Sequence, residues 1–483
     1  MHNKPGLTML NLRNLILLSL TVFFISCSKS DTNNGSSSAI TNFSFLKSAN
    51  AIPVDSYGSI SGTNINIFLP PGTNTNALIV NFTLSDSGIV RVNGVAQKNG
   101  STANDFSGPV TYTVTGLNGT TQSYTVNLVT GIGSVDQNVA AFMTQYNVPA
   151  MSIAITLNEK LVYVKAYGKS DVQNNVAATP QNLYRISSLS KQLTSVAIMK
   201  LMDQGKIQMT DKVFGQGAIL GTDYGTQPYG PGITDINVGE LLHHTEGGWP
   251  DNTTDPLGMN PSFSTQQILT WGLDNTPLLT TPGTPYSYYY SHFGYFILGR
   301  VIEKITGMPY AAAVQSLVLQ PSGINDMQIA GNTLADRLSN EVIYYGQNDQ
   351  DPYSFNINRM DAANGWVATA TDLARFLVHV DGLSSLTFLS PNALTVMTTG
   401  STANPKYACG WEINQYNLFH HGNLPGTGTS QAITTQSGNF NYVILANTNS
   451  SDPNFSGNMD NIFWSSLGPD TLWPTYDLFQ SGN

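Results

Sequence analysis

The chain has 483 residues, of which 41% are hydrophobic and 10% are charged, and its formal net charge is −10. This hydrophobic content can fill a sizeable core, and the length predicts two to three domains. The acidic balance excludes nucleic acid or anionic lipid as partners held by charge, and two cysteines exclude a cysteine-rich zinc site.

The N-terminus has the pattern of a secretory signal. Two basic residues precede an apolar run over residues 15–25, which is too short to span a bilayer as a helix. The run ends at Cys27, behind a small serine, and resembles the lipobox of bacterial lipoproteins with Phe24 where leucine is usual. The resemblance implies a signal peptide over 1–26, a lipid on Cys27 and export to the periplasmic or surface face of a bacterial membrane. The alternative is an ordinary signal peptide cleaved nearby.

Two segments follow the signal. Residues 27–38 are polar and rich in serine and asparagine, as expected of a lipid-anchored linker. Residues 39–131 hold short β-type runs bounded by Gly, Pro and Asn, and residues 110–129 alternate around a turn, which predicts a hairpin. About 90 residues of this spacing predict a small β-sandwich. The segment resembles the immunoglobulin-like modules of some bacterial surface lipoproteins, which implies a spacer or adhesive role.

Residues 132–483 are predicted to form one α/β domain. The stretch VDQNVAAFMTQYN after Ser134 has the pattern of an amphipathic helix, and two strands are expected on either side of Asn158 and Glu159. Helical and strand patterns then mix to the end of the chain.

A further helix is predicted to begin at Ser188 and to end at Gly205, because apolar residues between them recur at helical spacing. Residues three apart share a helical face, so Lys191 lies beside Ser188. A serine becomes a nucleophile when a base takes its proton, and burial lowers a lysine pKa toward that use. The N–H of Ser188 can face a developing oxyanion. The competing interpretation is a capping serine with an exposed lysine.

Several stretches occur in the order known from the serine β-lactamase-related hydrolases, the group of class C β-lactamases, DD-peptidases, D-aminopeptidases and related esterases. They are YRISSLSKQLTSVAI, INVGELLHHTEGG, NGWVATATDLARFL and YACGWEI, within residues 184–465. The resemblance implies an antiparallel sheet flanked by helices, with a helical subdomain, behind the N-terminal all-β sandwich. It also implies a cofactor-free serine hydrolase with Ser188 as nucleophile and Lys191 as its base.

The family's Y-x-N loop corresponds to PGTPYSYYYSHFGYFILG. Alignment on the following GYFILG makes Tyr290 the proton shuttle and places His292 where asparagine is usual, as a substrate-binding residue. Alignment on the preceding PGT would favour Tyr288. An asparagine offers a donor and an acceptor at any pH, whereas the role of a histidine depends on its protonation.

The family's strand motif corresponds to FHHGNLPGTGTS. The resemblance implies that His420 faces the pocket, that Gly422 lets substrate approach the strand, and that the backbone N–H of Asn423 is the second oxyanion donor. The motif is H-x-G rather than K-T-G, so a β-lactam ranks behind esters and D-amino-acid peptides of the cell-wall type as the substrate.

No metal is expected, because the adjacent pairs His243–His244 and His420–His421 lack the spacing of two ligands on one helical face. His243 and His244 are expected to hold the loop after their helix. The sequence therefore predicts a lipid-anchored serine hydrolase that uses an acyl-enzyme, with no nucleic acid partner. The alternative is a non-catalytic surface lipoprotein that binds peptide or glycan, or acts in adhesion, with a hydrolase-like domain.

Overall fold

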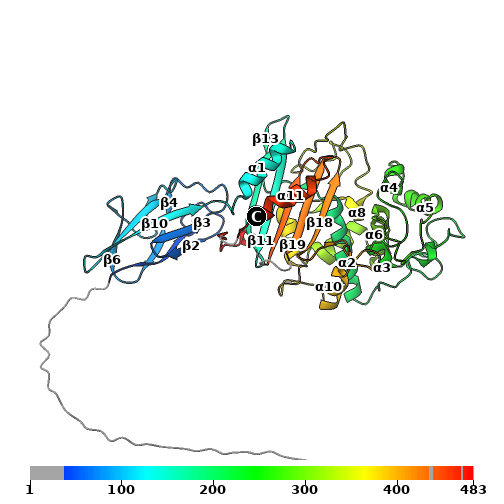
Figure 1. Ribbon diagram of the computed structural model, residues 1–483, viewed down its shortest axis with the longest axis horizontal. Coiled ribbons are helices and arrows are strands. Elements are labelled where there is room, and N and C mark those ends of the chain that lie inside the picture. Colours follow the sequence, from blue (N-terminus) through cyan, green and yellow to red (C-terminus); the bar gives the residue numbers. More distant parts are fainter. Residues whose placement is uncertain (1–36, 435–438, 469–470, 482–483) are drawn as a thin grey trace, which may run out of the picture.

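The computed structural model describes residues 37–434, 439–468 and 471–481. The predicted signal peptide, Cys27 and most of the linker lie outside the described residues. An all-β module comes first and a larger α/β domain follows (Figure 1). Within the described part of the chain, no helix has the length and apolar character needed to cross a membrane.

The N-terminal module consists of strands, which confirms the predicted all-β region. Antiparallel pairing of β9 with β10 forms the expected hairpin, and β3 lies parallel to β10 on its other side. Strand β2 joins this ladder to a second one made with β1 and β5, and aromatic and branched side chains fill the core. The strands are β1 (Ile40–Phe45), β2 (Ser56–Ser61), β3 (Asn64–Phe68), β4 (Leu78–Ile79), β5 (Asn81–Leu84), β6 (Gly88–Val92), β7 (Val95–Ala96), β8 (Ala103–Asn104), β9 (Val110–Gly116) and β10 (Thr121–Val129).

The second domain is built on an antiparallel sheet with the strand order β13-β12-β11-β20-β19-β18-β17. Strand β11 from the start of the domain pairs with β20 from near its end, in the middle of the sheet. The strands are β11 (Ala150–Leu157), β12 (Lys160–Asp171), β13 (Val176–Ala177), β17 (Glu412–Ile413), β18 (Asn417–Leu424), β19 (Thr427–Thr434) and β20 (Phe440–Ala446). The domain therefore has the antiparallel sheet that the sequence predicts.

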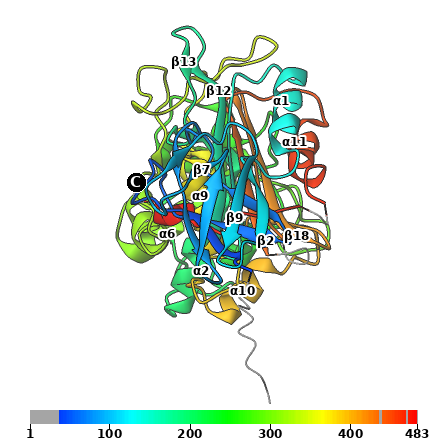
Figure 2. The ribbon, with the colours of Figure 1, turned by 90° about the vertical axis from the view of Figure 1, so that its left-hand side faces the viewer.

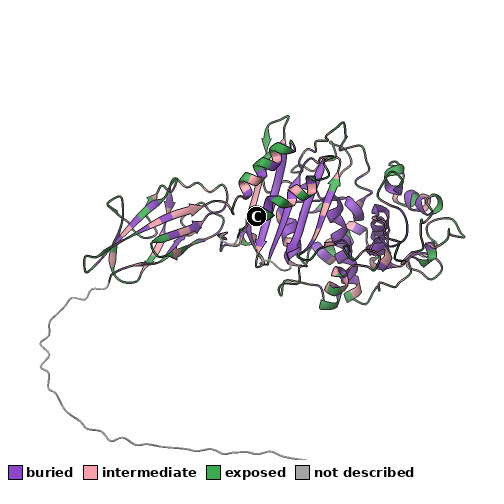
Figure 3. Ribbon diagram, in the orientation of Figure 1, coloured by how far each residue is buried: buried purple, intermediate pink, exposed green. Residues whose placement is uncertain are grey.

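Both faces of this sheet are covered, which makes the central strands almost wholly buried (Figure 3). Side chains of a strand alternate between faces. On β11, Met151 and Ile153 accordingly pack under the outer helices α1 (Val135–Gln145) and α11 (Phe455–Trp464). Figure 2 shows these two helices side by side. Ala150 and Ala154 face the main core on the opposite side.

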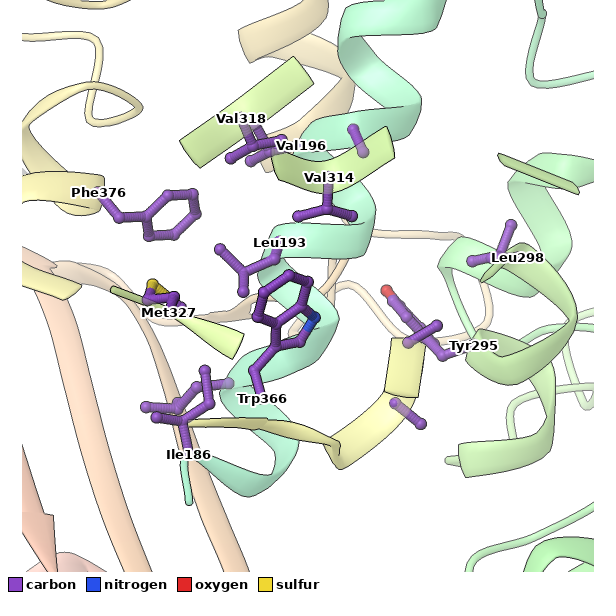
Figure 4. Packing of buried hydrophobic residues seen from close by; sticks show 14 of the residues in the cluster. Ile186, Leu193, Val196, Tyr295, Leu298, Val314, Val318, Met327, Trp366 and Phe376 are labelled. Carbon is purple, nitrogen blue, oxygen red and sulfur yellow. The ribbon is translucent and has the colours of Figure 1, made fainter. Parts of the chain in front are cut away.

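The main core is formed by the helical part of the domain. Figure 4 shows Leu193 and Val196 among Val318, Trp366 and Phe376. These five residues come from four separate elements of the chain. The elements of this part are α2 (Ser190–Asp203), α3 (Val238–Leu242), α4 (Pro256–Met259), α5 (Thr265–Asn275), α6 (His292–Thr306), α7 (Tyr310–Val314), the π-helix Gln315–Leu319, α8 (Asp361–Asn364), α9 (Ala370–Val378), α10 (Pro391–Thr398) and the 3₁₀ turns Ser187–Leu189, Ile233–Asp235 and Leu478–Gln480.

A small sheet fixes the chain just before Ser188. Strand β14 (Tyr184–Arg185) pairs with β16 (Trp366–Ala368), which also pairs with β15 (Gln328–Ile329). The ladder continues one residue further, where the N–H of Ile186 donates to the carbonyl oxygen of Trp366 at 2.9 Å. The turn that holds Ser188 therefore starts from a position held by hydrogen bonds and by the core.

The module also contacts the second domain. Val54 belongs to the same hydrophobic cluster as Leu161 and Leu478, and Phe68 packs against that cluster. This contact lies on the β12 side of the sheet, at the end of the strand order opposite to β18.

Removal of the module should leave the chemistry intact, since the module supplies none of the residues implicated by the family motifs. A shortened chain that begins at Ser134 should keep kcat/KM on a small soluble ester within about tenfold of the full chain, equal to about 1.4 kcal/mol. Its thermal stability should fall, because Leu161 and Leu478 lose their cover. A loss of kcat/KM well beyond tenfold with the shortened chain still folded would show that the module shapes the pocket.

Candidate active site

Ser188 lies in the 3₁₀ turn that leads into α2, and its side chain is almost buried. The preceding Ser187 has a positive φ of 50°, a conformation that side chains other than glycine seldom adopt. Strand β18 passes this turn closely: a Cβ added to Gly422 would lie 2.8 Å from the carbonyl oxygen of Ile186 and 3.0 Å from Cβ of Ser187. A glycine is therefore required where the strand meets the turn.

Lys191 is fully buried one turn further along, and its ammonium group is the centre of the site. Nζ lies 3.2 Å from Ser188 Oγ, 3.1 Å from the carbonyl oxygen of Ala363 and 3.0 Å from Nδ1 of His292. Burial lowers the Lys191 pKa to about 7, while the charges of Asp251 and Asp255 act in the opposite direction. A lysine with this pKa can accept a proton at neutral pH.

Asn364, the last residue of α8, completes the contacts of the Ser188 hydroxyl. Ser188 Oγ donates to Asn364 Oδ1 at 3.1 Å, and Lys191 Nζ lies 3.5 Å from the same oxygen. Sequence reasoning did not identify this residue as part of the site. The motif NGWVATATDLARFL begins at Asn364, so its place in that motif was the available signal.

Tyr290, not Tyr288, is the tyrosine that the structure brings to Ser188 and Lys191. Its ring centroid lies 4.9 Å from Lys191 Nζ, and its hydroxyl interacts with the Ser188 hydroxyl. Burial raises the Tyr290 pKa well above its usual value, so the phenol holds its proton at rest. Tyr288 instead faces His244 and Tyr407.

His292 is the first residue of α6, whose N-cap Ser291 accepts from the N–H of Gly294 at 2.9 Å. Both of its ring nitrogens have partners in the protein: Nδ1 contacts Lys191 Nζ, and Nε2 lies 3.0 Å from Asp251 Oδ1. The imidazole therefore bridges Lys191 and Asp251, and its role in substrate binding stays a prediction. Asp251 belongs to no motif that sequence reasoning used.

The strand motif borders the same site. His420 is buried between the rings of Tyr290 and Tyr407, at centroid distances of 6.1 and 5.9 Å. The N–H of His421 is hydrogen-bonded to the Glu412 carboxylate of β17, so it points away from β19. Backbone N–H groups two residues apart in a strand point the same way, and the N–H of Asn423 therefore faces this edge too, beyond the end of β17.

A neutral hydrogen-bonded network supports the pocket. Nδ1 of His244 accepts from the N–H of Ser291 at 3.1 Å, so its Nε2 donates to the Tyr407 hydroxyl at 3.1 Å. Tyr407 in turn lies 3.4 Å from His420 Nε2, and His420 Nδ1 donates to the carbonyl oxygen of His421 at 2.6 Å. Burial lowers the pKa of His244 well below its usual value and that of His420 to about 4.

His243 and His244 hold their loop as expected: His243 Nδ1 contacts the carbonyl oxygen of Gly239 at 2.8 Å, and Nε2 contacts that of Thr399 at 3.1 Å. The described ranges contain no group of three or more His, Cys, Asp or Glu side chains arranged to hold a metal ion.

Comparison with known proteins agrees with this architecture. The chain is 26% identical over 325 residues to Protein flp of Staphylococcus aureus strain MRSA252; the match covers 65% of this chain and 63% of the relative's length. Among solved structures, the octameric penicillin-binding protein homologue from Pyrococcus abyssi has a TM-score of 0.57 at 19% identity, over 69% of this chain and 77% of that one. The D-amino acid amidase from Ochrobactrum anthropi SV3 has a TM-score of 0.55 at 18% identity, over 69% and 98% of the two chains.

Two family profiles match the chain. The profile described as "SGBP, N-terminal" matches residues 40–128, which is the all-β module. The Beta-lactamase profile matches residues 135–467, more than half of the chain, and confirms the resemblance drawn from the motifs. The chain belongs to the Beta-lactamase family, a family of hydrolases.

Proposed function

We propose that this protein is a serine hydrolase that forms an acyl-enzyme at Ser188 and acts on an ester, a D-amino-acid peptide or a related amide. The observation that carries the proposal is the 3.2 Å contact between Ser188 Oγ and the fully buried Nζ of Lys191. Family membership and the similarity in fold to a D-amino acid amidase support it.

In the first step, Ser188 Oγ bonds to the substrate carbonyl carbon while its proton moves to the neutral amine of Lys191. The hydroxyl hydrogen must first turn from Asn364 Oδ1, its partner at rest, toward Nζ. When the bond to the leaving group breaks, that group takes the proton from Lys191. The Tyr290 hydroxyl, which interacts with that of Ser188, would pass the proton on.

The negative charge of the tetrahedral intermediate needs donors that are already in position. The N–H groups of Ser188 and Asn423 supply them, because Gly422 brings β18 against the nucleophile turn. Water then attacks the ester carbon of the acyl-enzyme and gives a proton to Lys191. The acid product leaves as Ser188 Oγ takes that proton back.

The charge states of the two histidines on β18 help to rank the candidate substrates. His420 is neutral at neutral pH, since burial lowers its pKa to about 4. Burial disfavours the charge of His421, but Asp460 and Glu412 raise its pKa to about 10 and neutralise that charge. A substrate carboxylate therefore finds no unpaired cation on β18, so neutral esters and amides rank first and β-lactams, which carry a carboxylate, rank last.

We also propose that the chain is exported and anchored to a bacterial membrane by a lipid on Cys27. The support is the lipobox-like sequence behind a short apolar run. In this arrangement the linker and the module would hold the active site away from the membrane.

Ser188→Ala should abolish covalent labelling by a fluorophosphonate probe and lower turnover of p-nitrophenyl esters by about 10³-fold or more. Screening the wild type against D-alanyl peptides and a chromogenic cephalosporin would rank the other substrates. Ser187→Ala, at the position immediately before Ser188, is the matched control and should still be labelled. Equal labelling of wild type and Ser188→Ala would favour the non-catalytic binding lipoprotein instead.

The pH dependence of kcat/KM should report Lys191. Below pH about 7 the lysine is protonated and cannot accept the proton of Ser188, so kcat/KM should rise about tenfold per pH unit on the acid side and level off above pH about 7. The measurement uses a substrate that does not titrate between pH 5 and 9, with Lys191→Met as the inactive control. A flat profile across this range would argue against Lys191 as the base.

Replacement of Cys27 should release the protein from the membrane, because the lipid is attached through its thiol. In a bacterial host, the wild type should enter the detergent phase of a Triton X-114 separation and Cys27→Ser should stay in the aqueous phase. Cys409→Ser is the matched control and should behave like the wild type. Detergent-phase recovery of Cys27→Ser would contradict the lipid anchor.

A further inference from the structure

Asp251 stands next to the catalytic lysine without belonging to any of the motifs. Its backbone N–H donates to the carbonyl oxygen of Tyr290 at 2.7 Å, which ties its loop to the tyrosine segment. Its Oδ1 lies 3.0 Å from Nε2 of His292, and its side chain is 44% exposed while that of His292 is 9% exposed. The aspartate thus forms the outer end of a row that runs inward through His292 and Lys191 to Ser188.

The contact with Asp251 decides which nitrogen of His292 carries the proton. An ionised carboxylate only accepts hydrogen bonds. Burial raises the Asp251 pKa, but the hydrogen bond from His292 helps to hold it below its usual value. Nε2 therefore donates to Asp251. In the neutral imidazole the other nitrogen is then an acceptor, so Nδ1 turns a lone pair toward Lys191 Nζ at 3.0 Å.

This choice of tautomer also orients the lysine. A neutral lysine amine has two N–H donors and one lone pair. Nζ has four hydrogen-bond partners, of which Asn364 Oδ1 is the most distant at 3.5 Å. The carbonyl oxygen of Ala363, at 3.1 Å, can only accept. If Nδ1 of His292 also accepts, both N–H donors are used, and the lone pair is left to face Ser188 Oγ at 3.2 Å.

With the opposite tautomer, Nδ1–H would donate to the lysine lone pair. Lys191 would then turn an N–H toward Ser188 and could not take its proton. The direction of the lysine lone pair thus depends on a carboxylate that touches neither Ser188 nor the substrate.

We propose that Asp251 is a positioning residue of the hydrolase: by accepting from Nε2–H of His292, it keeps Nδ1 unprotonated and so directs the lone pair of Lys191 at Ser188. The proposal rests on the function proposed for Ser188 and Lys191.

Other groups near His292 do not provide this contact. The ring of Tyr290 meets the imidazole edge to face at a centroid distance of 5.8 Å. Asp255 acts on the region through its charge. His244 is neutral, and its ring nitrogens are hydrogen-bonded to Ser291 and Tyr407. The Oδ1 of Asp255 caps α4 by accepting from the N–H of Leu257 at 2.8 Å, so Asp255→Asn removes a nearby charge and keeps a capping side chain.

The first test reads the tautomer without using activity. In the full chain labelled with ¹⁵N-histidine, at pH 8, the His292 ring should show a protonated Nε2 and an unprotonated Nδ1. The His292→Asn variant assigns the signals. Asp251→Ala should shift the ring toward the Nδ1–H form or a mixture, whereas Asp255→Asn should leave it unchanged. A wild-type ring protonated at Nδ1, alone or together with Nε2, would overturn the proposal.

The second test asks whether Asp251 acts through His292. The measurement uses the alkaline plateau of the pH profile, where a shift of the Lys191 pKa no longer changes kcat/KM. There, Asp251→Ala should lower kcat/KM at least about tenfold. The same change in the His292→Asn background should cost about twofold or less, because an asparagine has no tautomer to set. Asp255→Asn should cost about threefold or less in either background.

An equal loss from Asp251→Ala in both backgrounds would assign Asp251 a merely structural role and overturn the proposal. Failure of the underlying function has a different signature. If Ser188→Ala kept its activity, the nucleophile would be wrong, while the ¹⁵N spectrum would still report whether Asp251 sets the tautomer of His292.

Discussion

The burial of the Lys191 ammonium group is the constraint on which the rest of the site depends. A fall of the lysine pKa from 10.5 to about 7 corresponds to about 5 kcal/mol against the charged form. The fold offsets part of this cost with acceptors from separate elements, among them the carbonyl oxygen of Ala363 and the ring of His292. Elements far apart in sequence must therefore converge on one nitrogen, and the core around Trp366 keeps them there.

Tyr290 and two of the histidines near this lysine are neutral at rest, while the carboxylate of Asp251 lies beyond His292. Tyr290 keeps its proton because burial raises its pKa, and His244 and His420 stay neutral because burial lowers theirs. Hydrogen bonds through Tyr407 satisfy the imidazoles without any charge. In such a medium of low polarity, the few charges that form during a reaction interact strongly.

The adjacent His420 and His421 show how strand geometry gives neighbouring residues different surroundings and different pKa values. Successive side chains of a strand point to opposite faces of the sheet. His420 faces the tyrosines of the pocket, and burial lowers its pKa to about 4. His421 faces α11, where it meets Asp460 at 2.8 Å, and despite its burial the two neighbouring carboxylates raise its pKa to about 10. Two neighbouring residues of one strand thus differ in charge. His420 is a neutral residue at the pocket, and His421 is a cation paired with carboxylates.

The sequence by itself determined the all-β module, the α/β domain with its antiparallel sheet, and the family, because periodicity and ordered motifs are local properties of the chain. Spacing of three along a helix was also enough to pair Ser188 with Lys191. Asn364 lies 176 residues from Ser188, and no local pattern connects such positions. The same holds for Asp251 beside His292, and for the choice of Tyr290 over Tyr288 as the neighbour of Ser188. Only tertiary packing decided these contacts and the depth of burial that sets the lysine pKa, because both depend on which elements meet in space.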